Sequence, residues 1–207
     1  MPTLRVPTGV KSKADLIGAF NMPFFTTDIP GLIVVEPKVF KDDRGYFFES
    51  YNEQVFRDNG IDVRFVQDNQ SWSSYGVIRG LHYQLHPYAQ AKLVRVLQGR
   101  ILDIAVDVRP GSPTYGRHFP IELSAENQKQ LFIPAGFAHG FSVLSETASV
   151  LYKCDHFYNK ESEGGIIYND PSLNIDWQIP PGKEIVSEKD VQLPSLAEAK
   201  NNFQFQQ

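Results

Sequence analysis

Arg79 and His82 stand three residues apart in the segment VIRGLHYQ, residues 77–84, whose composition is typical of a short β-strand. An arginine can hold an anion through paired hydrogen bonds, and a neutral imidazole can accept a proton near pH 7. In a regular strand, residues three apart point to opposite faces. The two side chains can therefore share one pocket only if Gly80 forms a bulge or bend, which we predict. The alternative for His82 is an ordinary packed or surface histidine.

A second histidine, His139, ends the segment PAGFAH at residues 134–139. This segment has the P-x-G-x-x-H form of the second motif of the cupin superfamily, whose members are small jelly-roll β-barrels. The first cupin motif usually supplies an H-x-H pair, but here it reads His82-Tyr83-Gln84, and no glutamate follows at the usual spacing. A catalytic zinc or non-haem iron normally needs three protein ligands. The sequence therefore predicts a barrel without a metal or cofactor, in which His82 is a Brønsted base.

The elements that must position these histidines are short strands separated by turn signals. The segments that we expect to be strands are 32–36, 45–51, 63–67, 92–98, 101–108, 119–123, 131–133, 141–144 and 149–153. Such a succession predicts an all-β sandwich or barrel. Together with the cupin motif, it indicates a jelly-roll β-barrel with a few short peripheral helices.

Residues 101–108 show the clearest alternation in the chain. It places Leu102, Ile104, Val106 and Val108 on one face and Asp103, Ala105 and Asp107 on the other. A period of two predicts a strand in a sheet with one buried face.

The domain organisation is simple, because 207 residues with 42% hydrophobic content suffice for one good core. We expect a single jelly-roll domain over residues 29–193 and a helix over residues 52–59, which Gly60 follows. Residues 1–28 are weakly patterned, and we expect an N-terminal extension or arm that becomes ordered only against a partner subunit. Residues 194–207 form a C-terminal tail, with helical turns near 196–200 and a frayed end.

Charge and cysteine content limit the partners and the compartment. The formal net charge of -4 argues against a nucleic acid or an anionic membrane as partner. No apolar run resembles a signal peptide or reaches the length of a membrane span. The single cysteine, Cys154, excludes an internal disulfide. We therefore expect a cytoplasmic protein.

Over residues 29–190 the sequence resembles the dTDP-4-dehydrorhamnose 3,5-epimerases, a metal-independent family of cupins that act on a 4-keto nucleotide sugar. The strings that carry the resemblance are FKDDRGYFFE (40–49), FVQDN (65–69), RGLHYQ (79–84), KLVR (92–95), FAHGF (137–141), LYK (151–153), NDP (169–171) and SEKD (187–190). Each string alone is weak, but so many in this order are specific. The resemblance implies inversion of carbons 3 and 5 of dTDP-4-dehydro-6-deoxy-D-glucose. The product, dTDP-4-dehydro-L-rhamnose, leads to dTDP-L-rhamnose and cell-surface polysaccharide.

The resemblance also implies the catalytic roles. His82 is the base, Asp190 orients it, Tyr152 is the acid on the other face of the sugar, and Lys92 stabilises the negative charge that develops on O4. The segment before Asp190 is slightly longer than is common in the family, so Asp103 stays open as the alternative partner of His82.

The remaining family positions contact the substrate. Arg44 and Arg79 match the pyrophosphate-binding arginines, and His139 matches a position that contacts the ligand. The other predicted substrate-binding residues are Glu49, Gln67, Asp68, Asn69, Glu163 and Lys189, and Phe47, Phe157 and Tyr158 are candidates for stacking on the base or for ordinary packing.

Similar chains in the family are homodimers in which an N-terminal strand crosses to the neighbouring subunit, so some of these contacts can come from a partner.

Three alternative functions remain open. A mono-epimerase, which inverts only C3 or C5 of a dTDP-4-keto-6-deoxy sugar for another deoxysugar pathway, would keep much the same residues. A metal-dependent cupin and a non-catalytic sugar or nucleotide binder are the other two.

Overall fold

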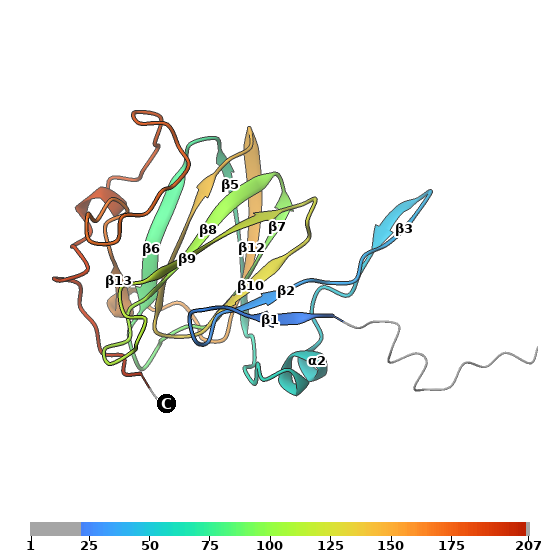
Figure 1. Ribbon diagram of the computed structural model, residues 1–207, viewed down its shortest axis with the longest axis horizontal. Coiled ribbons are helices and arrows are strands. Elements are labelled where there is room, and N and C mark those ends of the chain that lie inside the picture. The colour runs from blue at the N-terminus through green and yellow to red at the C-terminus, as the bar shows by residue number, and fades with distance from the viewer. Residues whose placement is uncertain (1–21, 206–207) are drawn as a thin grey trace, which may run out of the picture.

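The computed structural model describes residues 22–205 and shows two antiparallel sheets packed face to face (Figure 1). The six-stranded sheet has the order β1 (Phe24–Thr26), β2 (Ile33–Val35), β10 (Gln130–Ile133), β7 (Lys92–Gln98), β12 (Thr147–Cys154) and β5 (Gln67–Ser74). The five-stranded sheet has the order β13 (Glu163–Gly165), β6 (Ile78–Gln84), β11 (Phe137–Val143), β8 (Arg100–Asp107) and β9 (His118–Ser124). The predicted all-β jelly roll is confirmed.

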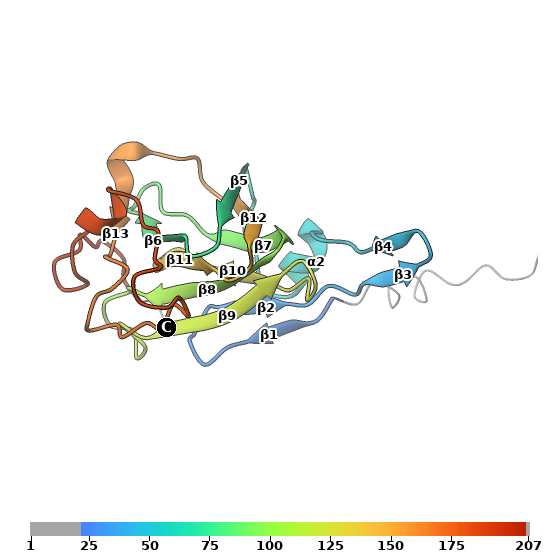
Figure 2. The ribbon, with the colours of Figure 1, turned by 90° about the horizontal axis from the view of Figure 1, so that it is seen from above.

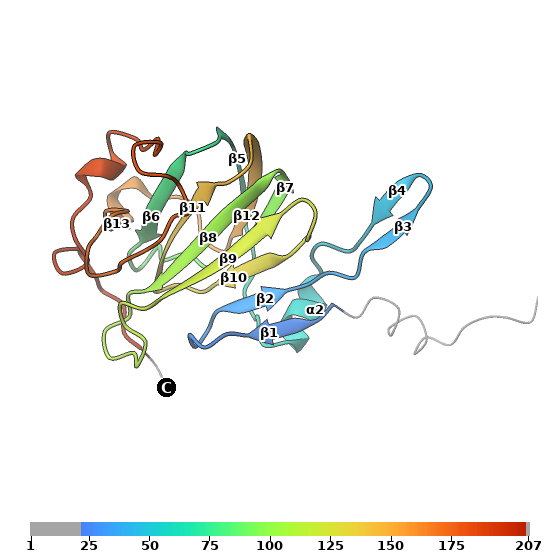
Figure 3. The same cartoon turned by 45° about the horizontal axis from the view of Figure 1, so that its top comes forward.

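A small hairpin extends from this sandwich. It consists of β3 (Phe40–Asp42) and β4 (Gly45–Phe47), which pair only with each other among the described residues. Figures 2 and 3 show the hairpin pointing away from the barrel, on the side opposite to the C-terminal segment. The hairpin tip therefore lies away from the barrel of its own chain.

The main core lies between the two sheets. Alternate residues of β7, β10 and β12 point inward, among them Val94, Leu131 and Val150, and they pack against Phe141 and Val143 of β11. Each of these five side chains is buried. The period of two along the strands thus produces one continuous apolar layer.

β8 corrects the expectation of a single buried face. Its apolar face, which includes Leu102 and Ile104, packs against Leu173 and Trp177 of the C-terminal segment on the outside of the barrel. The opposite face points into the barrel and is also buried, with Ala105 in the main core. Because both faces of β8 are covered, its aspartates lie inside the barrel. The alternation of apolar and polar residues does not by itself distinguish this arrangement from a strand with one face in water.

The predicted boundaries hold best where the strands are apolar. The strand at residues 92–98 is found as predicted, and the predicted helix appears as α2 (Glu53–Asp58), capped by Asn52, whose side chain accepts hydrogen bonds from the amides of Gln54 and Val55. The strand expected at residues 63–67 is wrong, because β5 instead covers Gln67–Ser74. Its sequence, QDNQSWSS, has almost no apolar pattern.

Both chain ends depart from expectation within the described residues. Residues 24–26 form β1 and pair with β2 of the same chain, so this part of the N-terminal arm needs no partner to be placed, while residues 1–21 lie outside the described residues. The helical turns expected near 196–200 are present as a single turn, in which the Ala199 amide donates to the Ser195 carbonyl at 2.9 Å. The end up to residue 205 is not frayed, because Phe203 is buried and the Asn202 side chain bonds to both the amide and the carbonyl of His86.

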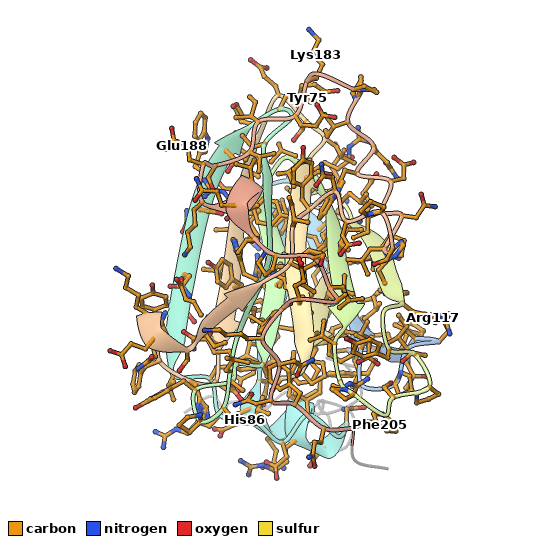
Figure 4. The ribbon with its side chains drawn as sticks, turned by 90° about the vertical axis from the view of Figure 1, so that its left-hand side faces the viewer. Tyr75, His86, Arg117, Lys183, Glu188 and Phe205 are labelled. Atoms are coloured by element: carbon orange, nitrogen blue, oxygen red, sulfur yellow. The ribbon has the colours of Figure 1, made fainter. Side chains whose placement is uncertain are left out.

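The C-terminal segment crosses one end of the barrel before it reaches the short helix η3 (Asp190–Gln192). Ile185 forms a parallel bridge with Val77, just before β6. Figure 4 shows Lys183 and Glu188 at the same end of the barrel as Tyr75, with His86 and Phe205 at the other end. This path brings Asp190 beside β6 although 108 residues separate it from His82.

No helix within residues 22–205 is long and apolar enough to cross a membrane.

Candidate active site

The bend predicted at Gly80 is present. Gly80 has a φ of 126°, and the ladder between β6 and β11 shifts register between His139 and Phe141. A Cβ at this position would lie 2.5 Å from the Cα of Gly140, so the two strands can approach this closely only with glycine. As a result, Arg79 and His82 line one cavity of about 490 Å³.

His82 pairs with Asp190, as the resemblance implied. The His82 Nε2 atom lies 2.8 Å from Oδ1 of Asp190, and Oδ2 accepts a hydrogen bond of 3.3 Å from the Gly80 amide. Burial of Asp190 by itself would raise its pKa. The bonds from His82, the Gly80 amide and Ser187 outweigh this effect, so that the pKa lies below the ordinary value. The carboxylate is therefore ionised at neutral pH and can stabilise an imidazolium.

Asp103, the alternative partner, contacts the other histidine. Its carboxylate is fully buried and lies 2.9 Å from Nε2 of His139. His139 and His82 are register partners on β11 and β6, and both line the cavity. The site thus contains two histidine–carboxylate pairs side by side on the five-stranded sheet.

The opposite wall of the cavity belongs to the six-stranded sheet and carries Lys92 and Tyr152. Burial lowers the pKa of Lys92. Burial, together with the neighbouring Cys154, raises the pKa of Tyr152 despite the opposing effect of Arg79. Tyr152 is therefore a protonated phenol at neutral pH, and it faces the histidine wall across the cavity.

A second cavity of about 580 Å³ adjoins the first and shares His82, Lys92 and Tyr152 with it. Its outer part is polar and contains four of the predicted substrate-binding residues together with Tyr158: Gln67, Asn69, Glu163 and Lys189. The Lys189 Nζ atom donates a hydrogen bond of 2.7 Å to Glu163. The two cavities thus meet at His82, Lys92 and Tyr152.

Three predicted substrate-binding residues are not brought to these cavities within the chain. The Arg44 side chain is 89% exposed on the projecting hairpin and pairs with Asp42. Glu49 follows the same hairpin and accepts a hydrogen bond from Asn52. Asp68 points away from the barrel and pairs with Lys153 at 3.0 Å.

Other lining residues were missed. Ser71 has a buried hydroxyl with no hydrogen-bond partner among the described residues, and it lines the first cavity with Phe141 and Ser187. The available signal was the polar alternation of β5, in which Gln67, Asn69 and Ser71 share the inward face. In an apolar-pattern search such a strand goes unnoticed.

Within residues 22–205 no three His, Cys, Asp or Glu side chains are arranged to hold a metal ion. Gln84 stands where the first cupin motif usually has its second histidine. Its side chain is buried and bonds to the backbone of two neighbouring loops.

The fold and the opposed side chains are typical of an acid–base enzyme of the jelly-roll class, with histidine–carboxylate pairs on one sheet and a tyrosine and a lysine on the other. Comparison with known proteins specifies the family. The model of the dTDP-4-dehydrorhamnose 3,5-epimerase family matches residues 26–198. The chain is 54% identical to the dTDP-4-dehydrorhamnose 3,5-epimerase of Pseudomonas aeruginosa over 172 residues, which are 83% of this chain and 94% of that protein.

Solved structures agree. The epimerase of the same name from Elizabethkingia anophelis is 54% identical, with a TM-score of 0.82 over 86% of this chain and 97% of that one. The dTDP-6-deoxy-D-glucose-3,5-epimerase of Legionella pneumophila, in complex with dTDP-4-keto-L-rhamnose, is 47% identical, with a TM-score of 0.83 over 86% and 94%. The chain belongs to the dTDP-4-dehydrorhamnose 3,5-epimerase family, and it is an epimerase of the isomerase class.

Proposed function

We propose that the enzyme inverts C3 and C5 of dTDP-4-dehydro-6-deoxy-D-glucose to give dTDP-4-dehydro-L-rhamnose, in the biosynthesis of dTDP-L-rhamnose. The observation that carries this proposal is the placement of His82 and Tyr152 on opposing sheets of one cavity. Epimerisation beside a ketone removes a proton from one face of the ring and returns one to the other. A base and an acid that face each other across the sugar meet this requirement.

His82 removes the proton, and Asp190 orients the ring and stabilises the imidazolium that forms. Removal of a proton beside the ketone places negative charge on O4, which the Lys92 ammonium in the same cavity stabilises. Tyr152 then delivers its proton to the opposite face. Each of these groups belongs to the chain itself, so the reaction needs no cofactor.

The nucleotide occupies the second cavity, where amide and charged side chains can bond to a base, a ribose and a pyrophosphate. Arg79 lines the first cavity, where it can hold a phosphate, and its guanidinium bonds to Ser73 at 3.0 Å. His139 bonds to Asp103 and contributes a polar contact to the sugar.

Proton exchange tests this function directly. When the protein is incubated in D₂O with dTDP-4-keto-6-deoxyglucose, NMR is expected to show loss of the protons at both C3 and C5. Exchange at one carbon only would assign a mono-epimerase instead. No exchange, with dTDP still bound, would indicate a nucleotide binder.

We further propose that the enzyme is a cytoplasmic homodimer in which each site receives Arg44 and Glu49 from the partner subunit. Support comes from the projecting hairpin, whose exposed Arg44 lies away from both cavities of its own chain. A pyrophosphate needs cations, and a hairpin inserted from a second copy would supply one.

Mixing two inactive variants tests the shared site. Arg44→Ala and His82→Ala are each expected to show little activity, because each removes one half of every site. After the two are mixed and allowed to exchange subunits, half of the dimers are hybrids with one intact site, and about a quarter of the wild-type activity returns. If Arg44 acts within its own subunit, no hybrid has an intact site and activity stays low.

A further inference from the structure

Three glutamine side chains converge on a single stretch of backbone beside the second cavity. We call Gln67, Gln84 and Gln90 the glutamine cluster. They come from β5, from β6 and from the loop that follows β6, and all three line the second cavity. The backbone that they hold is residues 156–159, the segment between β12 and the short helix η2 (Lys160–Ser162).

Gln84 makes the most bonds. Its Oε1 atom accepts a hydrogen bond of 2.7 Å from the Asn159 amide, and its Nε2 atom donates to the Phe157 carbonyl at 3.3 Å and to the Tyr88 carbonyl at 2.7 Å. The side chain is 5% exposed. All three hydrogen bonds of this side-chain amide therefore go to the backbone of loops, and the amide is largely shielded from water.

The other two members hold the residues between these points. Gln67 accepts a hydrogen bond of 3.1 Å from the Tyr158 amide, and Gln90 donates one of 2.7 Å to the His156 carbonyl. Four consecutive residues thus have a backbone group bound to a glutamine side chain. Loops usually run over the surface, so a loop segment with four backbone groups bound by side chains is held unusually firmly.

The Tyr158 side chain makes the consequence specific. Tyr158 is 56% exposed and lines the second cavity, although its backbone is held on both sides. Exposure of a large aromatic ring on a rigid loop suits stacking on a planar ligand group. A ring placed in advance also avoids the entropy loss of ordering the loop on binding.

We propose that the glutamine cluster is a positioning device for nucleotide binding: it fixes residues 156–159 so that Tyr158 meets the base of the substrate. The cluster acts on affinity for the nucleotide and leaves the proton-transfer step at His82 and Tyr152 unchanged. Gln84, which occupies the position of a metal ligand in the first cupin motif, is in this enzyme the central member of the cluster. The inference rests on the proposed function, since it assumes that the nucleotide occupies the second cavity.

The test is Gln84→Met, which keeps the shape of the side chain and removes all three hydrogen bonds. The Kd for dTDP, measured by calorimetry, and the KM for the nucleotide sugar are expected to rise about tenfold, while kcat stays within about twofold. Gln84→Glu, which keeps the acceptor for the Asn159 amide, is expected to recover part of the affinity. A fall in kcat with an unchanged Kd for dTDP would overturn the proposal.

A double-mutant cycle asks whether Gln84 acts through Tyr158. In the Tyr158→Ala background, Gln84→Met is expected to change the dTDP Kd by less than about twofold, because the group that it positions is already absent. Additive effects would show that Gln84 acts elsewhere, and would overturn the inference.

A matched control separates positioning from stability. Gln128 is also buried, and its Nε2 atom donates to the Ala125 carbonyl at 2.5 Å in the turn between β9 and β10, away from both cavities. Gln128→Met is expected to lower Tm but to leave the dTDP Kd unchanged.

A second variant covers the case in which Gln84→Met fails to fold. Gln90→Met removes one hydrogen bond of the cluster, and it is expected to raise the dTDP Kd by a smaller factor. Failure of the wild-type protein to bind dTDP would overturn the proposed function as well, whereas normal dTDP binding by both Gln84→Met and Gln90→Met would overturn this inference alone.

Discussion

His82→Ala is expected to lower kcat for epimerisation by about 10²- to 10⁴-fold, the range that a positioned general base contributes. In D₂O the variant should show no exchange at C3 or C5 on the time scale of wild-type turnover. The reason is geometric: His82 is the lining histidine that bonds to Asp190, whose lowered pKa keeps it as a carboxylate able to stabilise the imidazolium. Steady-state kinetics and NMR exchange on the same samples give both quantities.

The controls for this variant use the other histidines. His118→Ala changes a half-buried residue of β9 that lines neither cavity, and it is expected to keep near wild-type activity. Binding of dTDP to His82→Ala should remain measurable, because the outer part of the second cavity is unchanged. If His82→Ala still exchanges both protons at more than a tenth of the wild-type rate, the base lies elsewhere. His139, which has its own carboxylate in Asp103, would then be the next candidate.

The sequence predicted the residues on β6 that line the site better than it predicted the strand β5, which lines the opposite side. Glycine and histidine carry strong local requirements, so Gly80 predicted the bend that brings Arg79 and His82 together. The polar strand β5 was placed wrongly because its inward residues face a cavity instead of the apolar core. Hydrophobic periodicity detects a strand through burial against apolar neighbours, and it fails where the strand is built to meet a polar ligand.

Buried carboxylates show the same limit. On β8, Asp103 and Asp107 looked like the solvent face of an alternating strand, yet both are fully buried with partners. Asp103 pairs with His139, and Asp107 pairs with Arg109 at 2.7 Å and accepts bonds from Ser112 and Thr114. Whether a carboxylate is exposed or buried in a pair depends on residues far away in the sequence, which local pattern does not contain.

Long-range geometry also decides which aspartate pairs with His82. Sequence motifs left Asp190 and Asp103 open, and only the path of the C-terminal segment over the end of the barrel brings Asp190 to His82. The projecting hairpin has the opposite effect, because it removes Arg44 from the site of its own chain. A motif can thus predict a site residue without indicating where the fold places it within the chain.

Lys92→Ala is expected to lower kcat by about 10²- to 10³-fold, the usual effect of losing a donor at a developing oxyanion. Lys92→Met, which keeps the apolar stem, should be equally impaired, whereas Lys129→Met, which changes a surface lysine paired with Glu36, should be unaffected.

The pH profile of the wild-type enzyme distinguishes the charge of Lys92 from its packing. Burial lowers the pKa of Lys92, so the ammonium loses its proton at a lower pH than an ordinary lysine. As the pH rises, wild-type kcat/KM should therefore begin to fall before the pH reaches about 10.4, the ordinary pKa of lysine. Tyr152, whose pKa is raised, cannot cause this early loss, because its phenol deprotonates only above the ordinary value. A Lys92→Met variant with wild-type kcat, or a wild-type profile that stays flat to the ordinary lysine range, would show that the charge on O4 is stabilised by another group.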